Sequence, residues 1–211
     1  MSKLGIVIPY RDRLPDLDAL HAPLVKSLGR NNFEIIISEQ CDAKPFNRGL
    51  SNNIGIKAAI DSGATHAVTH DVDSIPLRAD YTPCKHIARL CGIFNGRCTP
   101  SGNGGPYLGG IVMLSLEAVR ITDGYPNKLF GWGHEDDILR ERAWKNGAEI
   151  EYRCGFYMVR DHPRDLSKYW ENGVFCAQNK QNLGGVSSIN NMASFEVGYN
   201  KFGTHVKFTC F

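Results

Sequence analysis

The chain has 211 residues, of which 42% are hydrophobic and 22% charged, and its formal net charge at pH 7 is +2. These values are typical of a soluble globular protein, and the charge is too small for the basic footprint of a nucleic-acid-binding protein. No apolar run reaches the length that a membrane-spanning helix requires. The sequence therefore predicts one globular domain over 1–211, with no nucleic-acid partner and no membrane-spanning segment.

The N-terminal residues lead into an apolar run within a few positions, which leaves no room for a signal peptide. The seven cysteines include no CxxC pair and match no zinc pattern. We therefore expect reduced thiols and a cytoplasmic location.

The first seventy residues alternate between apolar runs and helical patterns. Residues 5–10, 33–38 and 66–70 have the composition of buried strands, and 14–30 and 46–60 have helical spacing. Strands that alternate with helices in this way form βαβ units. The fold class predicted is α/β, with a Rossmann-like, mostly parallel central sheet flanked by helices.

The rest of the chain is less regular. Residues 80–105 are rich in Gly, Pro and Cys and give no clear element. Strands are expected at 107–115, 149–160 and 204–211, and a helix is expected to begin near Ile138 and to end before Gly147. Residues 164–192 are polar and form either a mobile lid or a set of short elements.

The segment 130–138 places Trp132 between two glycines and follows it with Glu135, Asp136 and Asp137. Acids at the start of a helix often only cap it, since the helix dipole favours negative charge there. A tryptophan held between glycines faces a cleft more readily than a core, which favours a working carboxylate.

A second acidic motif, Asp71-Val72-Asp73, follows the strand at 66–70. Parallel strands end at one edge of a sheet, where open α/β sheets bind ligands. Arg11 and Arg13 fall on the same edge. Taken alone, an acidic pair of this kind is usually a solvated turn, but a carboxylate on a rigid strand end also suits a divalent metal that holds a diphosphate.

Together these motifs resemble the β-1,4-galactosyltransferases. The resemblance rests on 8–13, 46–49, 71–73, 109–111 and the Gly-Trp-Gly-x-Glu-Asp-Asp block at 131–137, in the family's order. It implies a GT-A fold, Mn²⁺ as cofactor, a UDP-sugar donor and a carbohydrate or glycoconjugate acceptor. It also implies a division into a nucleotide-sugar-binding part (1–80), an acceptor-binding and catalytic part (81–162), and a lid loop with the last strand (163–211).

The resemblance also assigns roles to single residues. Asp136 would be the catalytic base, with Glu135 beside it holding the donor. The donor pocket would be formed by Pro9, Tyr10, Arg11, Arg13, Phe46, Arg48, Asp71, Gly110 and Trp132. The acceptor would meet Tyr107, Trp132 and Asp137, and the bulk of Tyr107 would favour galactose over N-acetylated sugars.

The metal site departs from the family pattern. The family carries Met-x-x-His, whereas this chain has Met158-Val159-Arg160-Asp161-His162, which is one residue longer. If the strand continues, Met158, Arg160 and His162 share a face and Asp161 points away. We expect Asp73 and His162 as ligands, because imidazole suits Mn²⁺ better than a thioether does, with Met158 possible and Asp161 in reserve.

A further departure is His134, where the family usually has glycine.

The resemblance implies an inverting transfer of a hexose, foremost galactose from UDP-galactose, to a sugar hydroxyl. The same fold with UDP-GalNAc, UDP-GlcNAc or UDP-glucose as donor is an alternative, and so is a carbohydrate-binding derivative that has lost turnover.

Overall fold

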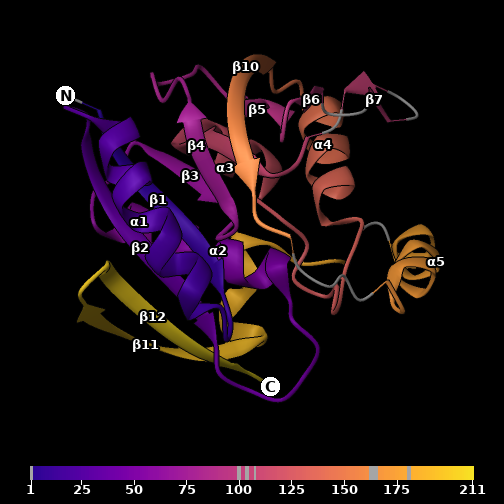
Figure 1. The fold of residues 1–211 in the computed structure, drawn as a ribbon. Coiled ribbons are helices and arrows are strands. Elements are labelled where there is room, and N and C mark those ends of the chain that lie inside the picture. The colour runs from indigo at the N-terminus through magenta and orange to yellow at the C-terminus, as the bar shows by residue number, and fades with distance from the viewer. Residues whose placement is uncertain (1, 99–100, 103–104, 107, 162–165, 180–181) are drawn as a thin grey trace.

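The computed structural model describes residues 2–98, 101–102, 105–106, 108–161, 166–179 and 182–211 (Figure 1). One large sheet runs through the molecule and helices cover both of its faces. Its strands are β1 (Lys3–Tyr10), β2 (Asn32–Gln40), β3 (His66–His70), β4 (Ser74–Arg78), β5 (Ile87–Phe94), β6 (Arg97–Cys98), β9 (Ile111–Ser115), β10 (Ile150–Val159), β11 (Ala193–Asn200) and β12 (Gly203–Cys210). A separate two-stranded ribbon is formed by β7 (Ser101–Gly102) and β8 (Gly105–Pro106).

The helices are α1 (Leu14–Leu28), α2 (Arg48–Asp61), α3 (Leu116–Thr122), α4 (Glu135–Lys145), α5 (Tyr169–Asn179) and a 3₁₀ turn, η1 (Val186–Asn191). Among the described residues, no helix is long and apolar enough to cross a membrane. All seven cysteines are free thiols.

The strands follow the order β11-β12-β2-β1-β3-β9-β5-β10-β4, and β6 pairs with β5. The α/β class is confirmed, but the sheet is mixed rather than mostly parallel. β1 pairs in parallel with β2 and β3, and β12–β2 and β5–β10 are parallel too. β9 lies antiparallel between β3 and β5, and each end of the sheet carries an antiparallel strand.

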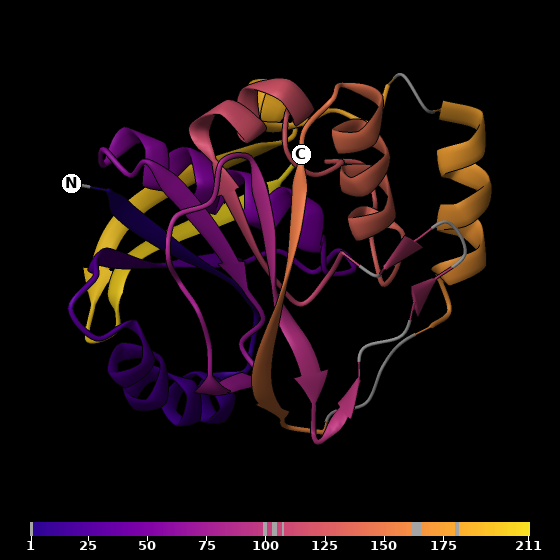
Figure 2. The ribbon, with the colours of Figure 1, turned by 90° about the horizontal axis from the view of Figure 1, so that it is seen from above.

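The core lies in two layers because side chains alternate across the sheet. On one face Ile6, Ile8 and Ile35 pack against the apolar side of α1, and on the other Val7 and Ile36 pack against α2 and its neighbours. Figure 2 shows α1 on one side of the sheet and α2 with α3 on the other. Central strands that are buried on both faces explain the continuous apolar runs in the sequence.

The strand directions bring many chain segments to one edge of the sheet. β1, β2 and β3 end there, β5 and β10 end there because they run the same way, and β9 begins there because it is antiparallel. Residues 11–13, 46–48, 71–73, 110 and 159–161 therefore all belong to this edge.

Several expectations need correction. The segment 80–105 contains the central strand β5, and the strand expected at 107–115 begins only at Ile111. Within 164–192 the structure has two short elements, α5 and η1, so the second of the two alternatives for this segment is the correct one. β11 was not expected as a strand, and it pairs with β12 as a hairpin.

Candidate active site

A cavity of about 450 Å³ opens at the edge where the strand ends meet. It is lined by Asp71, Asp73, Ser74, Phe94, Asn95, Gly110, Trp132, Val159, Arg160 and Asp161. Five of these, Asp71, Asp73, Gly110, Trp132 and Asp161, were singled out from the sequence. Two motifs that lie sixty residues apart in the chain therefore face one space.

Arg48 is the centre of the charged cluster behind this cavity. It follows Asn47, whose side chain accepts a hydrogen bond from the Leu50 amide and caps α2. The Arg48 guanidinium donates from Nη2 to Asp71 Oδ1 at 2.8 Å and from Nη1 to Asp136 Oδ1 at 3.0 Å. A third bond runs from Nη1 to Glu135 Oε1 at 3.2 Å. One cation thus holds three carboxylates from two distant motifs.

Two of these acids come from the start of α4, which begins at Glu135 and has Glu135, Asp136 and Asp137 in its first turn. The helix ends at Lys145, and Gly147 follows with a φ of 74°, as its sequence predicts. The Asp137 side chain is 56% exposed, and its Oδ1 lies 3.4 Å from Arg140 Nη2. The expected contact of Asp137 with an acceptor stays a prediction.

Asp136 has the ionisation behaviour of a base that works near neutral pH. Burial raises its pKa to about 7, and the neighbouring carboxylates of Glu135 and Asp71 add to the rise, while Arg48 opposes it. The side chain is only 14% exposed. A carboxylate with a pKa near 7 accepts a proton far more readily than an ordinary aspartate.

The metal ligands expected from the sequence are only partly brought together. Asp73 is buried, and its Oδ2 accepts a bond from Arg13 Nη1 at 3.2 Å. Asp161 lines the same cavity, whereas Met158 does not. The expected alternation fails because β10 ends at Val159, after which the Arg160 amide donates to the Asp73 carbonyl oxygen at 2.9 Å.

The residues present fit Mn²⁺ in their chemistry, because carboxylate oxygens are ligands that Mn²⁺ favours. Asp71, Asp73 and Asp161 all line the cavity. Within the described part of the chain, no group of three or more His, Cys, Asp or Glu side chains is arranged to hold an ion. His162, the expected imidazole ligand, lies outside the described residues, as does Tyr107.

A second ion-pair network supports Asp73 from the side of α1. Asp16 accepts bonds from Arg13 Nε at 2.7 Å and from Arg160 Nε at 2.6 Å. Although burial raises the pKa of Asp16, these two arginines lower it overall. The sequence offered only a weak signal for this network, the i, i+3 spacing of Arg13 and Asp16 at a helix start.

Two further residues were missed by sequence reasoning. His70 is buried beside Asp71, with Nδ1 3.1 Å from the Asp71 carbonyl oxygen and Nε2 3.3 Å from the Tyr81 hydroxyl. Burial lowers the pKa of His70 to about 4, so it is neutral at pH 7. Asn95 fastens the end of β10, since its side chain accepts from the Val159 amide at 2.7 Å and donates to the Val159 carbonyl oxygen at 2.9 Å.

The Trp132 loop is held by the first turns of α5. The Trp132 and Tyr169 rings lie 5.4 Å apart, and Tyr169 stacks on His134 at 4.6 Å. A Cβ on Gly133 would come within 2.6 Å of Tyr169, so glycine is required for this packing. Trp132 itself stays 43% exposed, in a position to meet a ligand in the cavity.

The remaining residues assigned to the donor pocket lie on the same edge but outside the lining of the cavity. Pro9 and Tyr10 are buried at the end of β1, and the Arg11 guanidinium lies 5.4 Å from the centre of the Phe46 ring. The Phe46 carbonyl oxygen accepts a bond from the Gly131 amide at 2.9 Å, which connects this group to the Trp132 loop.

Two family descriptions match the chain, and together they take up most of it. The one described as the N-terminal region of glycosyl transferase group 7 matches residues 1–84, and the one described as the N-terminal domain of galactosyltransferase matches residues 95–163. The chain belongs to the β-1,4-galactosyltransferase family.

Relatives agree with this membership. The chain is 29% identical over 204 residues to β-1,4-galactosyltransferase 5 of Sus scrofa, covering 91% of this chain and 52% of the relative. It is 33% identical over 138 residues to the xylosylprotein 4-β-galactosyltransferase of Caenorhabditis elegans, covering 64% and 48% of the two chains. The chain thus spans about half the length of these curated relatives.

Another relative of the chain carries a different activity in its name. The β-N-acetyl-D-glucosaminide β-1,4-N-acetylglucosaminyltransferase of Lymnaea stagnalis is 35% identical over 151 residues, covering 67% of this chain and 30% of the relative.

Solved structures confirm the fold. The chain superposes on a Drosophila β-1,4-galactosyltransferase 7 mutant, in complex with manganese, UDP-Gal and xylobiose, with a TM-score of 0.81 and 20% identity. The match covers 100% of this chain and 95% of that one. The catalytic domain of the same Drosophila enzyme with xylobiose gives a TM-score of 0.76 at 20% identity, and covers 100% of this chain and 94% of that one. The GT-A fold is therefore shown.

Proposed function

We propose that this protein is an inverting hexosyltransferase that moves galactose from UDP-galactose to a hydroxyl of an acceptor sugar and uses Mn²⁺. The observation that carries the proposal is the Arg48 cluster, in which a buried Asp136 with a pKa of about 7 stands at the N-terminus of α4, behind a cavity lined by carboxylates. Family membership and the fold support it.

In this reaction Asp136 accepts the proton of the acceptor hydroxyl as that oxygen attacks the anomeric carbon of the donor. The bond from that carbon to the UDP oxygen breaks, and UDP leaves on the opposite face. Bound Mn²⁺ would supply positive charge to the leaving diphosphate, and Asp73 would hold it together with His162 or Asp161. Arg48 orients Asp136 and Glu135 through the bonds described above.

The other assignments belong to the same proposal. Asp71 and Gly110 would contact the donor, Trp132 would cover both sugars, and Pro9, Tyr10, Arg11, Arg13 and Phe46 would form the uridine and diphosphate part of the pocket. The Drosophila enzyme that shares this fold was captured with manganese and UDP-Gal, which supports the choice of donor and metal. The cytoplasmic location stays a prediction.

The donor is the point at which a second candidate has support. A relative named as an N-acetylglucosaminyltransferase is 35% identical to this chain, so UDP-GlcNAc is the alternative donor. Competition between UDP-galactose, UDP-GalNAc, UDP-GlcNAc and UDP-glucose for one acceptor separates the candidates. Preferred transfer of an N-acetylated sugar would reject galactose as the substrate.

The experiment that tests the proposal is a calorimetric titration of UDP into the protein with and without Mn²⁺. We expect binding that depends on the metal and is lost in Asp73→Asn. Glu171→Gln is a matched control, because it also neutralises one acid but lies on α5, where it pairs with Lys168 at 2.6 Å. Glycan binding without any metal-dependent binding of UDP would instead indicate a carbohydrate-binding derivative.

A further inference from the structure

The strand β11 forms an open edge of the large sheet. Among the described strands it pairs only with β12, along its full length from Ala193 to Asn200. Every residue of β11 after Ala193 is exposed. The strand contains no proline and no basic residue, and its one charged side chain is Glu196.

The opposite edge of the sheet is protected in ways that β11 is not. β4 has five residues, contains Pro76, which lacks an N–H group, and ends at the charged Arg78. Soluble proteins usually shield sheet edges by short length, proline, inward charge or a covering element, because an open edge pairs with other chains. An eight-residue edge without these devices is therefore a candidate for pairing.

The backbone groups that face outward on β11 follow from the hydrogen bonds on its inner side. The Cys41 amide donates to the Phe208 carbonyl oxygen at 2.8 Å, so Phe208 is bonded toward β2. Backbone N–H and C=O groups alternate in direction from one residue to the next along a strand, so those of Thr209, Lys207 and His205 face β11 and bond their partners there. On β11 the residues whose backbone groups face the open edge are therefore Phe195, Val197 and Tyr199.

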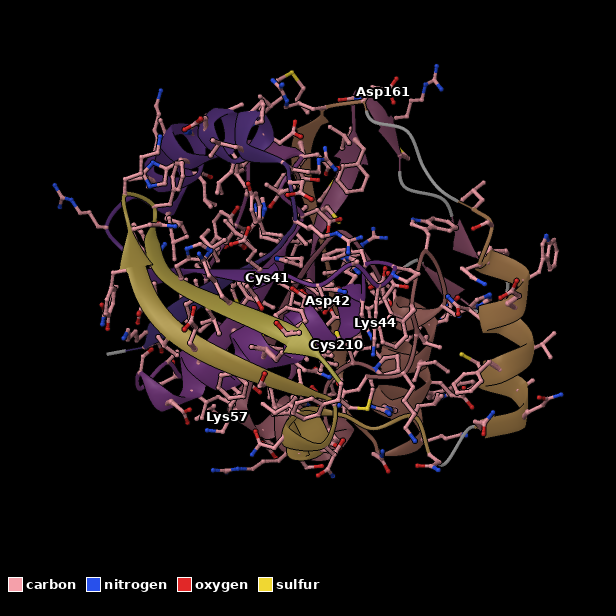
Figure 3. All side chains as sticks on the ribbon, turned by 90° about the horizontal axis from the view of Figure 1, so that it is seen from below. Cys41, Asp42, Lys44, Lys57, Asp161 and Cys210 are labelled. Carbon is pink, nitrogen blue, oxygen red and sulfur yellow. The ribbon has the colours of Figure 1, made fainter. Side chains whose placement is uncertain are left out.

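Figure 3 shows this hairpin from below, with Cys210 beside Asp42 at its inner side. The Cys210 amide donates to Asp42 Oδ2 at 2.7 Å, and the Phe211 amide donates to the Met192 carbonyl oxygen at 2.9 Å. The hairpin is thus tied to the body of the protein along β12, and its outer strand is the part that remains open.

The side chains of these three residues also form an apolar row. Phe195, Val197 and Tyr199 lie on one face of β11 and are 39%, 56% and 83% exposed. Their direct cross-strand partners, Phe208, Val206 and Thr204, are buried. The row therefore extends a core layer past the last strand, and nothing in the described part of the chain covers it.

We propose that the β11 edge is a homodimer interface, in which two copies pair β11 antiparallel about a two-fold axis at Val197. In this register Val197 faces its own copy, and Phe195 of each chain faces Tyr199 of the other, so aromatic rings meet twice. These are the residues whose backbone groups point to the edge, so each pair exchanges two hydrogen bonds.

The charges are compatible with a second copy as the occupant. Glu196 would lie opposite Gly198 of the other chain rather than opposite the other Glu196, so no like charges meet directly. Within its own chain Glu196 is the cross-strand neighbour of Lys207, which balances it on the polar face. The strand therefore matches itself in its backbone hydrogen bonding and in its row of apolar side chains, and it places no like charges directly opposite each other.

Sedimentation velocity across roughly 1–100 µM tests the proposal. We expect the mass to rise toward that of a dimer with concentration, and Val197→Lys to stay monomeric because it places two cations on the axis. Leu77→Lys is the matched control, since it adds the same charge to the 69%-exposed Leu77 on the opposite edge, and it should still dimerise. If the native protein stays monomeric over the whole concentration range, the proposal is overturned, and the partner of the β11 edge would have to be a different polypeptide.

A crosslinking experiment tests the register. In a hydrogen-bonded antiparallel pair the Cα atoms lie about 5.5 Å apart, within the range of a disulfide. Val197→Cys should therefore give a covalent dimer on mild oxidation. Glu196→Cys should not, because its two copies lie on a diagonal about 7–8 Å apart. The native thiols are common to both variants, so equal crosslinking of the two would reject the register.

Discussion

Arg48 Nη1 lies 3.0 Å from Asp136 Oδ1, so the residue that opens α2 holds the first turn of α4 by a charged hydrogen bond. The two residues are 88 positions apart in the chain. Arg48 was expected at the donor and Asp136 as the catalytic base. Their contact therefore couples the charge of the donor side to that of the catalytic carboxylate.

Replacement of Asp136 by Asn should abolish transfer and leave UDP binding intact. The amide keeps the shape of the side chain but cannot accept the proton, and a general base typically contributes about 10²–10⁴-fold to the rate. Initial rates with saturating donor and acceptor, beside a UDP titration of the same variant, provide the measurement. Turnover close to that of the native protein would reject Asp136 as the base.

The dependence of kcat/KM on pH should show one ascending limb with a midpoint near 7. Asp136 must be ionised to act, and burial raises its pKa to about 7, so activity is low below that pH and rises through it. The limb of kcat/KM reports the free enzyme. A midpoint near 4 would mean that Asp136 titrates as an ordinary aspartate or that another group is the base.

Substitution of Arg48 by Met should move this limb to higher pH. Arg48 lowers the pKa of Asp136, so loss of its charge should raise the midpoint by about 1–3 pH units. Arg140→Met is a suitable control, because Arg140 pairs with the exposed Asp137 and should leave the midpoint in place. A limb that does not move in Arg48→Met would show that the pair is not coupled in solution.

The metal site can be tested by comparing Asp161→Asn with Met158→Leu. Asp161 lines the cavity with Asp73 and Met158 does not, so only the first change should weaken the Mn²⁺-dependent binding of UDP, by about tenfold or more. Calorimetry at several Mn²⁺ concentrations measures the effect. The reverse order of the two variants would restore Met158 as the ligand.

His134 provides a stability prediction. It has a φ of 73°, a region that costs a residue with a Cβ roughly 1 kcal/mol or more and that glycine adopts freely. His134→Gly and His134→Ala both lose the stack on Tyr169, so the difference between them isolates the backbone cost. Urea unfolding should find the Gly variant more stable by about 1 kcal/mol. Equal stabilities would mean that the loop relaxes out of this conformation.

Much of the fold could be predicted because its first three strands are buried on both faces. Such strands give continuous apolar runs, and the helices between them show clear spacing, so 1–70 was assigned correctly. β5 was hidden because Arg89 and Gly92 interrupt its apolar pattern, and β11 because an edge strand exposed on both faces has no burial pattern to detect.

The candidate site was predictable as a set of residues but not as an arrangement. Local motifs indicated Asp71, Asp73, Trp132 and Asp136, since each has a recognisable flanking pattern. Nothing local indicates that Arg48 reaches three acids or that Asp16 joins Arg13 to Arg160, because these pairs form only when distant segments meet. The course of the chain after β10 was not predictable either, because the strand ends at Val159 and the Arg160 amide bonds the Asp73 carbonyl oxygen.

The charge balance of the Arg48 cluster is divided between the two halves of the chain. The cation and one acid come from the first 71 residues, and the other two acids come from residues 135 and 136. A chain that has folded only its N-terminal half leaves Arg48 without two of its counter-ions, and a displaced α4 leaves its acids without their cation. We therefore expect partly folded molecules to be inactive. During refolding, activity should appear only when the two halves of the chain have packed together.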